Sequence, residues 1–145
     1  LEDAQKAEVM ERCYAQENDA IRRRGGKLYD GVEDVLDDLS SRLRLFIVSN
    51  CQSGYIEAFH SYHNLDRHFI DWECSGDTGM TKAENIRLVI ERNALSKPIY
   101  VGDTRGDADA SKACGVPFVF AAYGFGAVED ADAAIASIHE LRSLL

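Results

Sequence analysis

The order of apolar and polar positions along the chain predicts alternating helices and strands. Residues 43–50 and 98–103 are mostly apolar runs that stop at small polar or acidic residues. Continuous apolar runs of this length are typical of strands buried on both faces of a parallel sheet. Elsewhere, apolar residues recur at helical spacing, and residues 76–79 have turn chemistry. We expect strands at 43–50, 69–73, 98–103 and 116–120, and helices at 2–24, 31–41, 53–64, 82–93, 108–114 and 130–144.

This alternation predicts an α/β fold with a parallel sheet, because strand and helix follow one another four times. The 145 residues, 46% of them hydrophobic, suffice for one domain with one core. In such sheets the functional crevice lies at the carboxyl ends of the strands. Ser49, Asn50 and Asp103 are therefore expected at the same rim.

Charge and cysteine content narrow the class of protein. The net charge is −9, which disfavours binding to nucleic acids and to anionic membranes. No apolar run approaches the ~18–20 residues that a membrane span requires. The four cysteines show neither a C-x-x-C pair nor the dense spacing of a disulfide scaffold. We expect reduced thiols and a cytoplasmic protein that binds neither nucleic acid nor membrane.

Polar residues that follow the two buried runs are the first candidate site. Asp103 and Asp107 are four residues apart, and two carboxylates converging at a strand end suit Mg²⁺. Capping of the next helix by Asp107 or Asp109 is the structural alternative, although it leaves Asp103 unexplained. Ser49 and Asn50 offer a hydroxyl, an amide and backbone N–H groups to phosphate oxygens, or they simply form a turn.

Lys82 is the third candidate, because it follows a Gly- and Thr-rich turn at a predicted helix start. A cation there opposes the helix dipole, and an anion held between Lys82 and a metal would explain the position. A solvated surface lysine is the alternative for Lys82 alone. Taken in order, a hydroxyl and amide, a lysine and a pair of acids are compatible with one phosphate-and-metal site.

These motifs, in this order, resemble those of haloacid dehalogenase-like (HAD) hydrolases, especially phosphatases of the phosphoglycolate phosphatase kind. Residues 46–50 are similar to the family's second motif, whose serine or threonine binds the transferred phosphoryl group. Lys82 resembles the lysine of the third motif, which holds nucleophile and phosphate together. Residues 100–107 resemble the fourth, Gly-Asp-x-x-x-Asp, which serves Mg²⁺, and residues 123–126 fit the segment after it. The resemblance covers about residues 28–126.

One motif of that family has no counterpart in this sequence. The first motif, Asp-x-Asp-Gly-Thr on the first strand, supplies the nucleophilic aspartate and the general acid, and no such sequence occurs here. The resemblance thus implies a three-layer, Rossmann-like α/β fold with a parallel sheet and the remnant of a helical cap at the N-terminus. Residues 1–27 are expected to be the end of the cap, and residues 28–145 a HAD-like core domain lacking its first strand.

The missing strand has a consequence for the sheet. In the family the strand order is 5-4-1-2-3, so the absent first strand is the central one. The strands at 43–50 and 98–103 would flank an empty slot with unpaired backbone groups, which are costly when buried. We expect the slot to be filled by an N-terminal fragment of the same protein, by a strand from a second copy, or by direct closure of the two strands.

The resemblance implies a Mg²⁺-dependent phosphatase of a small phosphorylated metabolite that works through an aspartyl-phosphate, with the catalytic aspartates outside this chain. Ser49 and Asn50 would hold phosphate oxygens, and Lys82 would neutralise developing charge. Asp103 would ligate Mg²⁺, and Asp107 would hold a metal-bound water or Lys82. The alternative is a non-catalytic phosphate-binding or regulatory module of the same fold, for which a missing nucleophile is also expected.

Other families fit the sequence less well. A signalling receiver domain places its acids first and its lysine last, which is the reverse of the order here. A dinucleotide-binding domain requires G-x-G-x-x-G after its first strand, and this chain has only Gly124-x-Gly126 after its last expected strand. His60 and His63 share a helix face and His68 follows. Without a matching carboxylate or cysteine, hydrogen-bonded core or surface histidines are favoured over a metal site.

Overall fold

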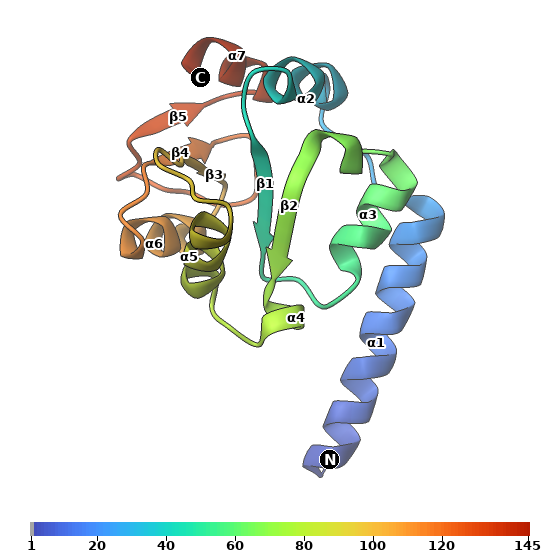
Figure 1. The fold of residues 1–145 in the computed structure, drawn as a ribbon. Coiled ribbons are helices and arrows are strands. Elements are labelled where there is room, and N and C mark those ends of the chain that lie inside the picture. Colours follow the sequence, from blue (N-terminus) through green and yellow to red (C-terminus); the bar gives the residue numbers. More distant parts are fainter. Residues whose placement is uncertain (1) are drawn as a thin grey trace.

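The computed structural model describes residues 2–145, which form helices and parallel strands in alternation (Figure 1). The fold class predicted from the sequence is confirmed. In chain order the elements are α1 (Asp3–Arg24), α2 (Val32–Ser40), β1 (Leu45–Ser49), α3 (Tyr55–His63), η1 (Asp66–His68), β2 (Phe69–Cys74), α4 (Ser75–Thr78), α5 (Lys82–Arg92), β3 (Tyr100–Gly102), α6 (Arg105–Ala113), β4 (Phe118–Ala121), β5 (Ala133–Ile135), η2 (Ile138–Glu140) and α7 (Leu141–Leu144).

The described strands form two sheets, and every strand pair is parallel. β1 pairs with β2, with Leu45 opposite Phe69 and Ser49 opposite Cys74. β3, β4 and β5 form the second sheet in that order. Parallel pairing brings the carboxyl ends of β1 and β2 to one edge, and it does the same for the second sheet. The candidate residues that follow β1 and β3 therefore lie at strand ends.

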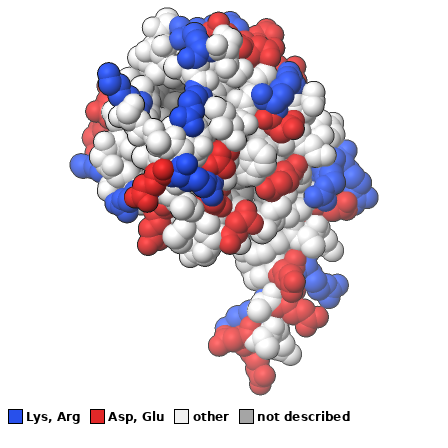
Figure 2. All heavy atoms as spheres, in the orientation of Figure 1, with Lys and Arg blue, Asp and Glu red and all other residues white. Residues whose placement is uncertain are grey.

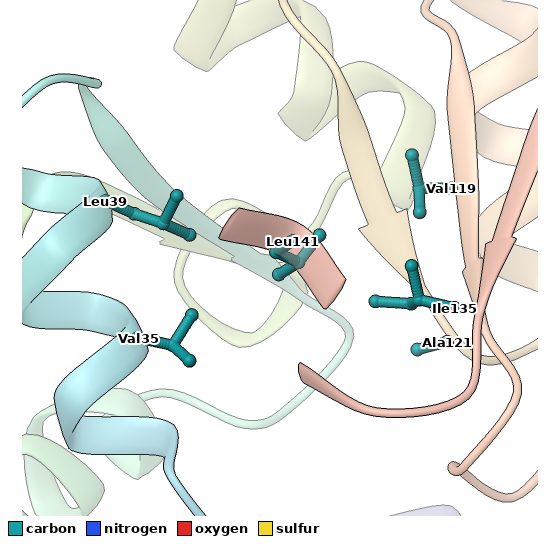
Figure 3. Close-up of a cluster of buried hydrophobic side chains, with 6 residues drawn as sticks. All are labelled: Val35, Leu39, Val119, Ala121, Ile135 and Leu141. Carbon is teal, nitrogen blue, oxygen red and sulfur yellow. The ribbon is translucent and has the colours of Figure 1, made fainter. Parts of the chain in front are cut away.

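The largest hydrophobic cluster joins the second sheet to the helices that cover it. Val35 and Leu39 of α2 pack with Leu141 of α7 against side chains of β4 and β5 (Figure 3). A second cluster holds Ile86 of α5 and Ala110 of α6. The members of the first cluster that come from β4 and β5 are Val119, Ala121 and Ile135.

A space separates β1 from β3, although each is an edge strand that faces the other sheet. It has a volume of about 780 Å³ and is lined by residues of both strands and of the helices above and below them. The face of the molecule shown in Figure 2 is hollowed near its top. The hydroxyl of Tyr100 on β3 donates to the carbonyl oxygen of Val48 on β1 at 2.9 Å. We call this space the slot.

The slot corrects one expectation about β1 and β3. Both were predicted to be buried on two faces, yet all five residues of β1 are only half-buried. Val101, in the middle of β3, is 37% exposed, and Ile99 just before it is 47% exposed. The apolar sequences are those of central strands, but among residues 2–145 no third strand lies between them.

Three other expectations about secondary structure were wrong. Residues 130–144 do not form one helix, because residues 133–135 pair with β4 and only η2 and α7 follow. Residues 76–79 are not an open turn, because most of them belong to the short helix α4. α6 begins at Arg105 rather than near residue 108, because Thr104 caps it. Asp107 therefore lies in the first turn of a helix, not before it.

Helix α1 lies along α3 and extends well beyond it (Figure 1). None of its residues is buried. Polar contacts connect it to the segment after β1: the Asn18 side chain donates to the carbonyl oxygen of Ser53 at 2.7 Å, and Gln52 donates to Asn18 and Glu17 at 3.0 Å. In the described chain, no helix has both the length and the apolar character needed to span a bilayer.

Candidate active site

Asp107 is the most constrained residue of the predicted site. It is buried, at 5% exposure, and both of its carboxylate oxygens accept hydrogen bonds. Oδ2 accepts from the backbone N–H and the hydroxyl of Thr104, at 3.0 and 2.8 Å, and from the N–H of Asp103 at 3.2 Å. Oδ1 accepts from the ammonium of Lys82. Some of these bonds form a capping box. Thr104 is the N-cap of α6, and the side chain of Asp107 accepts from the backbone N–H of Thr104.

Lys82 reaches this carboxylate from a different element. It is the first residue of α5, where Thr81 caps the helix, and its side chain is 16% exposed. The ion pair with Asp107 explains why a cation is placed at a helix N-terminus, which is unfavourable by itself. The structure therefore places the predicted third and fourth motifs together.

The hydrogen bonds determine the ionisation of Asp107. Burial alone raises the pKa of a carboxyl, but hydrogen bonds from Lys82 and Thr104 outweigh it and lower the pKa of Asp107 below its usual value. Asp107 is thus a carboxylate at neutral pH. An anionic Asp107 holds the ammonium of Lys82 in place through their ion pair.

Asp103 differs from Asp107 in having free coordination capacity. Its Oδ2 accepts from the backbone N–H of Phe125 at 2.8 Å, and no bond to Oδ1 is present among the described residues. The side chain is only partly buried. A carboxylate oxygen is therefore open toward the rim at the end of β3.

The loop of residues 124–126 packs directly on Asp103. A Cβ on Gly124 would lie 2.3 Å from the Cβ of Asp103, and one on Gly126 would lie 2.3 Å from the Asp103 carbonyl oxygen. Side chains at these two positions would push the loop off the carboxylate. Phe125 between them is 93% exposed and contributes its backbone N–H to the site.

Ser49 and Asn50 end β1 at the other sheet. The hydroxyl of Ser49 accepts from the N–H of Cys51 at 3.2 Å, which is the bond of a local turn. The side-chain oxygen of Asn50 accepts from the hydroxyl of Ser75 at 3.2 Å. The structure therefore supports the alternative in which Ser49 and Asn50 form a turn. The Asn50 amide NH₂ and the Ser49 hydroxyl proton remain available to oxygen atoms at the rim.

A second pocket lies beside Asn50, between the candidate site and α1. It has a volume of about 500 Å³. Its wall from α1 includes Glu11, Tyr14 and Asn18, and its other wall is residues 50–53, which follow β1, and the start of α4.

Two contributors to the site were missed by the sequence analysis. Thr104 was not predicted as a site residue, although a threonine three residues before an acid at a helix start is a capping signal. The backbone N–H of Phe125 carries no sequence signal of its own; only the two flanking glycines indicate a close approach. The histidine expectation was also wrong in part, because both ring nitrogens of the buried His60 lack a hydrogen-bond partner.

Comparison with known proteins decides the family. The model of haloacid dehalogenase-like hydrolases matches residues 1–121. The chain belongs to this family. It is 28% identical over 127 residues to a phosphoglycolate phosphatase of Pseudomonas savastanoi pv. phaseolicola, and 27% identical over 127 residues to one of Pseudomonas syringae pv. syringae. These matches cover 83% of this chain and 44% of each relative, so the chain spans less than half the length of the curated relatives it matches.

Solved HAD structures share the fold. A provisionally assigned phosphatase from Clostridium difficile superposes with a TM-score of 0.84 at 22% identity, covering all of this chain and 72% of that one. A HAD-superfamily hydrolase of subfamily IA from Geobacter sulfurreducens gives a TM-score of 0.71 at 25% identity, covering 81% of this chain and 61% of that one. The arrangement of helices and strands described above is therefore a HAD fold.

Members of the HAD superfamily generally use Mg²⁺, and the residues at this rim fit such an ion. No cluster of three or more histidine, cysteine or acidic side chains capable of holding a metal occurs within residues 2–145. Mg²⁺ does not need one, because it is commonly bound by one or two carboxylates together with waters and substrate oxygens. Asp103, with its free oxygen, is the side chain that would ligate the ion. Asp107, whose two oxygens accept hydrogen bonds, would contribute through its neighbours.

Proposed function

We propose that the protein is a Mg²⁺-dependent phosphatase of a small phosphorylated metabolite, in which this chain supplies the phosphate-binding and metal-binding groups. The observation that carries the proposal is the Lys82–Asp107 ion pair beside the free carboxylate oxygen of Asp103. Such a set offers a cation to phosphate oxygens and an anion to a metal. In this proposal the attacking aspartate belongs to polypeptide outside residues 1–145, and the product is released by hydrolysis of an aspartyl-phosphate.

Each residue has a separate role in the proposal. Ser49 and Asn50 donate to phosphate oxygens, and Lys82 neutralises charge that develops on the phosphoryl group. Asp107 fixes Lys82 by the ion pair. The metal, when bound by Asp103, supplies electrostatic stabilisation to the same group. Residues 1–27, as the end of a cap, form one wall of the pocket that receives the rest of the substrate, and the protein acts in the cytoplasm.

Binding of inorganic phosphate to the 145-residue chain tests the ligand part of the proposal. We expect calorimetry with Mg²⁺ present to detect binding that Lys82→Met weakens about 10- to 100-fold, because a charge-assisted hydrogen bond is lost. Lys112→Met, which removes an exposed lysine on α6, is the control and should leave the affinity unchanged. Equal effects of the two substitutions would contradict the proposed site.

The alternative is a module that binds phosphate without turnover. A polypeptide that includes the residues encoded before Leu1 separates the two possibilities. A phosphatase releases phosphate from small phosphate esters and loses this activity in Lys82→Met. A binding module retains the phosphate affinity and releases nothing.

A further inference from the structure

The segment that connects α1 to α2 contacts the loop that follows β4. Residues 25–31 form this segment, which we call the linker. Gly25 and Gly31 stand at its two ends with φ of 62° and 74°, conformations that favour glycine, so the backbone turns sharply at both ends. Between them, the ring of Tyr29 meets the ring of Tyr123 edge-on, with centroids 5.0 Å apart and planes at 76°. The linker is therefore packed against the start of that loop.

Tyr123 connects this contact to Asp103. Its side chain is half-buried and packs against the hydrophobic cluster that β4 and β5 share with α2. Burial raises the pKa of the Tyr123 hydroxyl, and the neighbouring Tyr29 hydroxyl and Asp103 carboxylate raise it further. The N–H of Gly124, the next residue, donates to the carbonyl oxygen of Ala121 at 3.0 Å, which fixes the turn after β4. Tyr123 thus has the linker as one neighbour and the Asp103 carboxylate as another.

Beyond Tyr123 the chain has little freedom before it reaches the Asp103 carboxylate. The N–H of Phe125, two residues later, donates to Oδ2 of Asp103 at 2.8 Å. Gly124 between them lies so close to Asp103 that a Cβ there would be 2.3 Å from the Asp103 Cβ. The side chain of Phe125 is 93% exposed, so it does not anchor the loop by packing. Tyr123 is therefore the nearest preceding side chain whose packing fixes the position of this N–H.

We propose that Tyr29 is a positioning residue for Mg²⁺. Its ring holds Tyr123, and through Tyr123 the Phe125 N–H, so that Asp103 keeps Oδ2 on this N–H and presents its other oxygen at the rim. This inference rests on the proposed function, because it takes Asp103 as the ligand of the metal. A carboxylate already oriented by its neighbours loses less freedom when it binds an ion, which raises affinity. Because such coupling is reciprocal, Mg²⁺ bound at Asp103 favours the linker conformation in which Tyr29 meets Tyr123.

The Mg²⁺ affinity of the 145-residue chain, measured by NMR titration, tests this role. We expect Tyr29→Ala to weaken Mg²⁺ binding about three- to tenfold, the effect that one edge-to-face aromatic pair can have. Tyr29→Phe should stay within about twofold of wild type, because the contact is made by the ring. Tyr62→Ala is the matched control: Tyr62 is 47% exposed, Tyr29 is 48% exposed, and the Tyr62 ring packs at Gly25, at the other end of the linker. This control should leave the Mg²⁺ affinity unchanged.

Amide hydrogen exchange provides a readout that needs no bound metal. In the metal-free chain, the Phe125 amide should exchange about three- to tenfold faster in Tyr29→Ala than in wild type or Tyr29→Phe. The amide of Phe120, in a strand that is paired on both sides, should change by less than about twofold. Saturating Mg²⁺ should slow exchange of the Val32 amide, which donates to the Tyr29 carbonyl oxygen at 3.3 Å, in wild type but not in Tyr29→Ala. The phosphate affinity that depends on Lys82 should be the same in all of these chains.

The outcomes separate this inference from the proposed function. If Mg²⁺ does not bind, or binds equally to Asp103→Asn, the proposed metal site is wrong and the role of Tyr29 is refuted with it. If binding requires Asp103 but is the same in Tyr29→Ala, the role of Tyr29 alone is refuted. Equal losses in Tyr29→Ala and Tyr62→Ala, or a Phe125 amide that exchanges as in wild type, would refute it as well. If Tyr29→Ala is unfolded, Tyr29→Leu, which keeps an apolar side chain without the ring, replaces it in every comparison.

Discussion

At the scale of single residues, the site depends on one carboxylate with four donors. Asp107 is buried, so its charge is tolerated only because Lys82, Thr104 and the Asp103 N–H bond to it. Removal of one partner of a buried ion pair leaves the other charge uncompensated. Lys82 is therefore important for stability, in addition to its proposed role in binding an anion.

Lys82→Met should therefore lower the free energy of unfolding at pH 7 by about 2–4 kcal/mol. The pKa of Asp107 is lowered in the folded protein, so its stabilising contribution is present above its unfolded pKa and is lost as the pH falls through the folded value. The difference between wild type and variant should therefore shrink toward pH 3. Urea denaturation at several pH values measures it, and Lys112→Met is the control.

Mg²⁺ affinity should separate the two acids. Asp103 has a free carboxylate oxygen, whereas both oxygens of Asp107 are occupied. In the polypeptide with its upstream residues, we expect Asp103→Asn to weaken Mg²⁺ binding about 100-fold and Asp107→Asn about tenfold, because Asp107 acts through its neighbours. Calorimetric titration decides between them. Equal losses, or a larger loss at Asp107, would reverse the two assignments.

The sequence indicated candidate residues for this site but not the contacts between them. Residue spacing and strand ends indicate Lys82, Asp103 and Asp107 as candidates from the sequence alone. The direct pairing of Lys82 with Asp107, across 25 positions, came only from the structure. The capping bond of Thr104 can be predicted from the local sequence. The contact of the Phe125 N–H with Asp103 cannot, because it depends on how the loop of residues 124–126 packs on the end of β3.

At the scale of elements, the C-terminal segment is where the local sequence pattern predicts the wrong secondary structure. Residues 130–144 contain alanines and leucines at helix-compatible positions, and helix propensity is a weak prior that tertiary contacts override. Residues 133–135 instead complete the edge of a sheet, where Ile135 is 3% exposed in the core of Figure 3. Sheet pairing with β4 is a long-range contact, so the local sequence did not reveal it.

Truncation of this side chain tests the importance of β5. Ile135→Ala should lower the free energy of unfolding by about 2–4 kcal/mol, since it creates a cavity beside Val35 and Leu141. Ile70→Ala is the matched control, because Ile70 is 55% exposed, and it should change stability by less than about 1 kcal/mol. Urea denaturation measures both. Similar losses at the two positions would contradict the role of β5.

The packing of α3 against β2 contains a buried histidine. His60 is 3% exposed, lies against Phe69 and Trp72, and both of its ring nitrogens lack partners. Burial lowers the pKa of His60, and the carboxylates of Asp66 and Glu57 offset this only in part. The folded state therefore keeps the ring neutral at a pH where the unfolded chain takes up a proton.

The free energy of unfolding should consequently fall as the pH drops below about 6.5. The decrease should be up to about 1.4 kcal/mol per pH unit, until the pH reaches the pKa of His60 in the folded protein. His60→Phe should abolish this part of the pH dependence and raise stability at pH 7 by about 1 kcal/mol, because no unpartnered polar atom remains. His139→Phe, at a surface position, is the control. Thermal denaturation between pH 5 and 7.5 measures how stability changes with pH. An unchanged pH dependence in His60→Phe would exclude His60 as its cause.

At the scale of the whole molecule, the site is divided between the two sheets. Ser49 and Asn50 end one sheet, whereas Asp103 and Asp107 follow the edge strand of the other. The sequence predicted both rims, because each buried run ends in polar residues. It could not show the width of the slot, since apolar character indicates that a strand is central without identifying its neighbours. The order of the second sheet, with β4 paired to β3 and to β5, depends on contacts between residues far apart in the chain.

The 145-residue chain alone should accordingly hydrolyse aryl phosphates no faster than a blank containing Mg²⁺. Loss of a nucleophile from a catalytic unit costs about 10⁴- to 10⁶-fold in rate. The most buried thiol at the rim does not replace it, because burial and the hydrogen bond to Asp77 raise the pKa of Cys74 to about 12 and keep it protonated. The hydroxyl of Ser49 accepts from the backbone N–H of Cys51 and contacts no general base among residues 2–145.

The assay compares purified 145-residue chain, its Asp103→Asn variant and the polypeptide with its upstream residues. Only the last should release nitrophenolate from p-nitrophenyl phosphate above the blank. Turnover by the 145-residue chain that disappears in Asp103→Asn would show that a group within residues 1–145 performs the attack. The nucleophile would then have to be sought at the rim, among the side chains at the ends of β1 and β2, rather than on a strand that enters the slot.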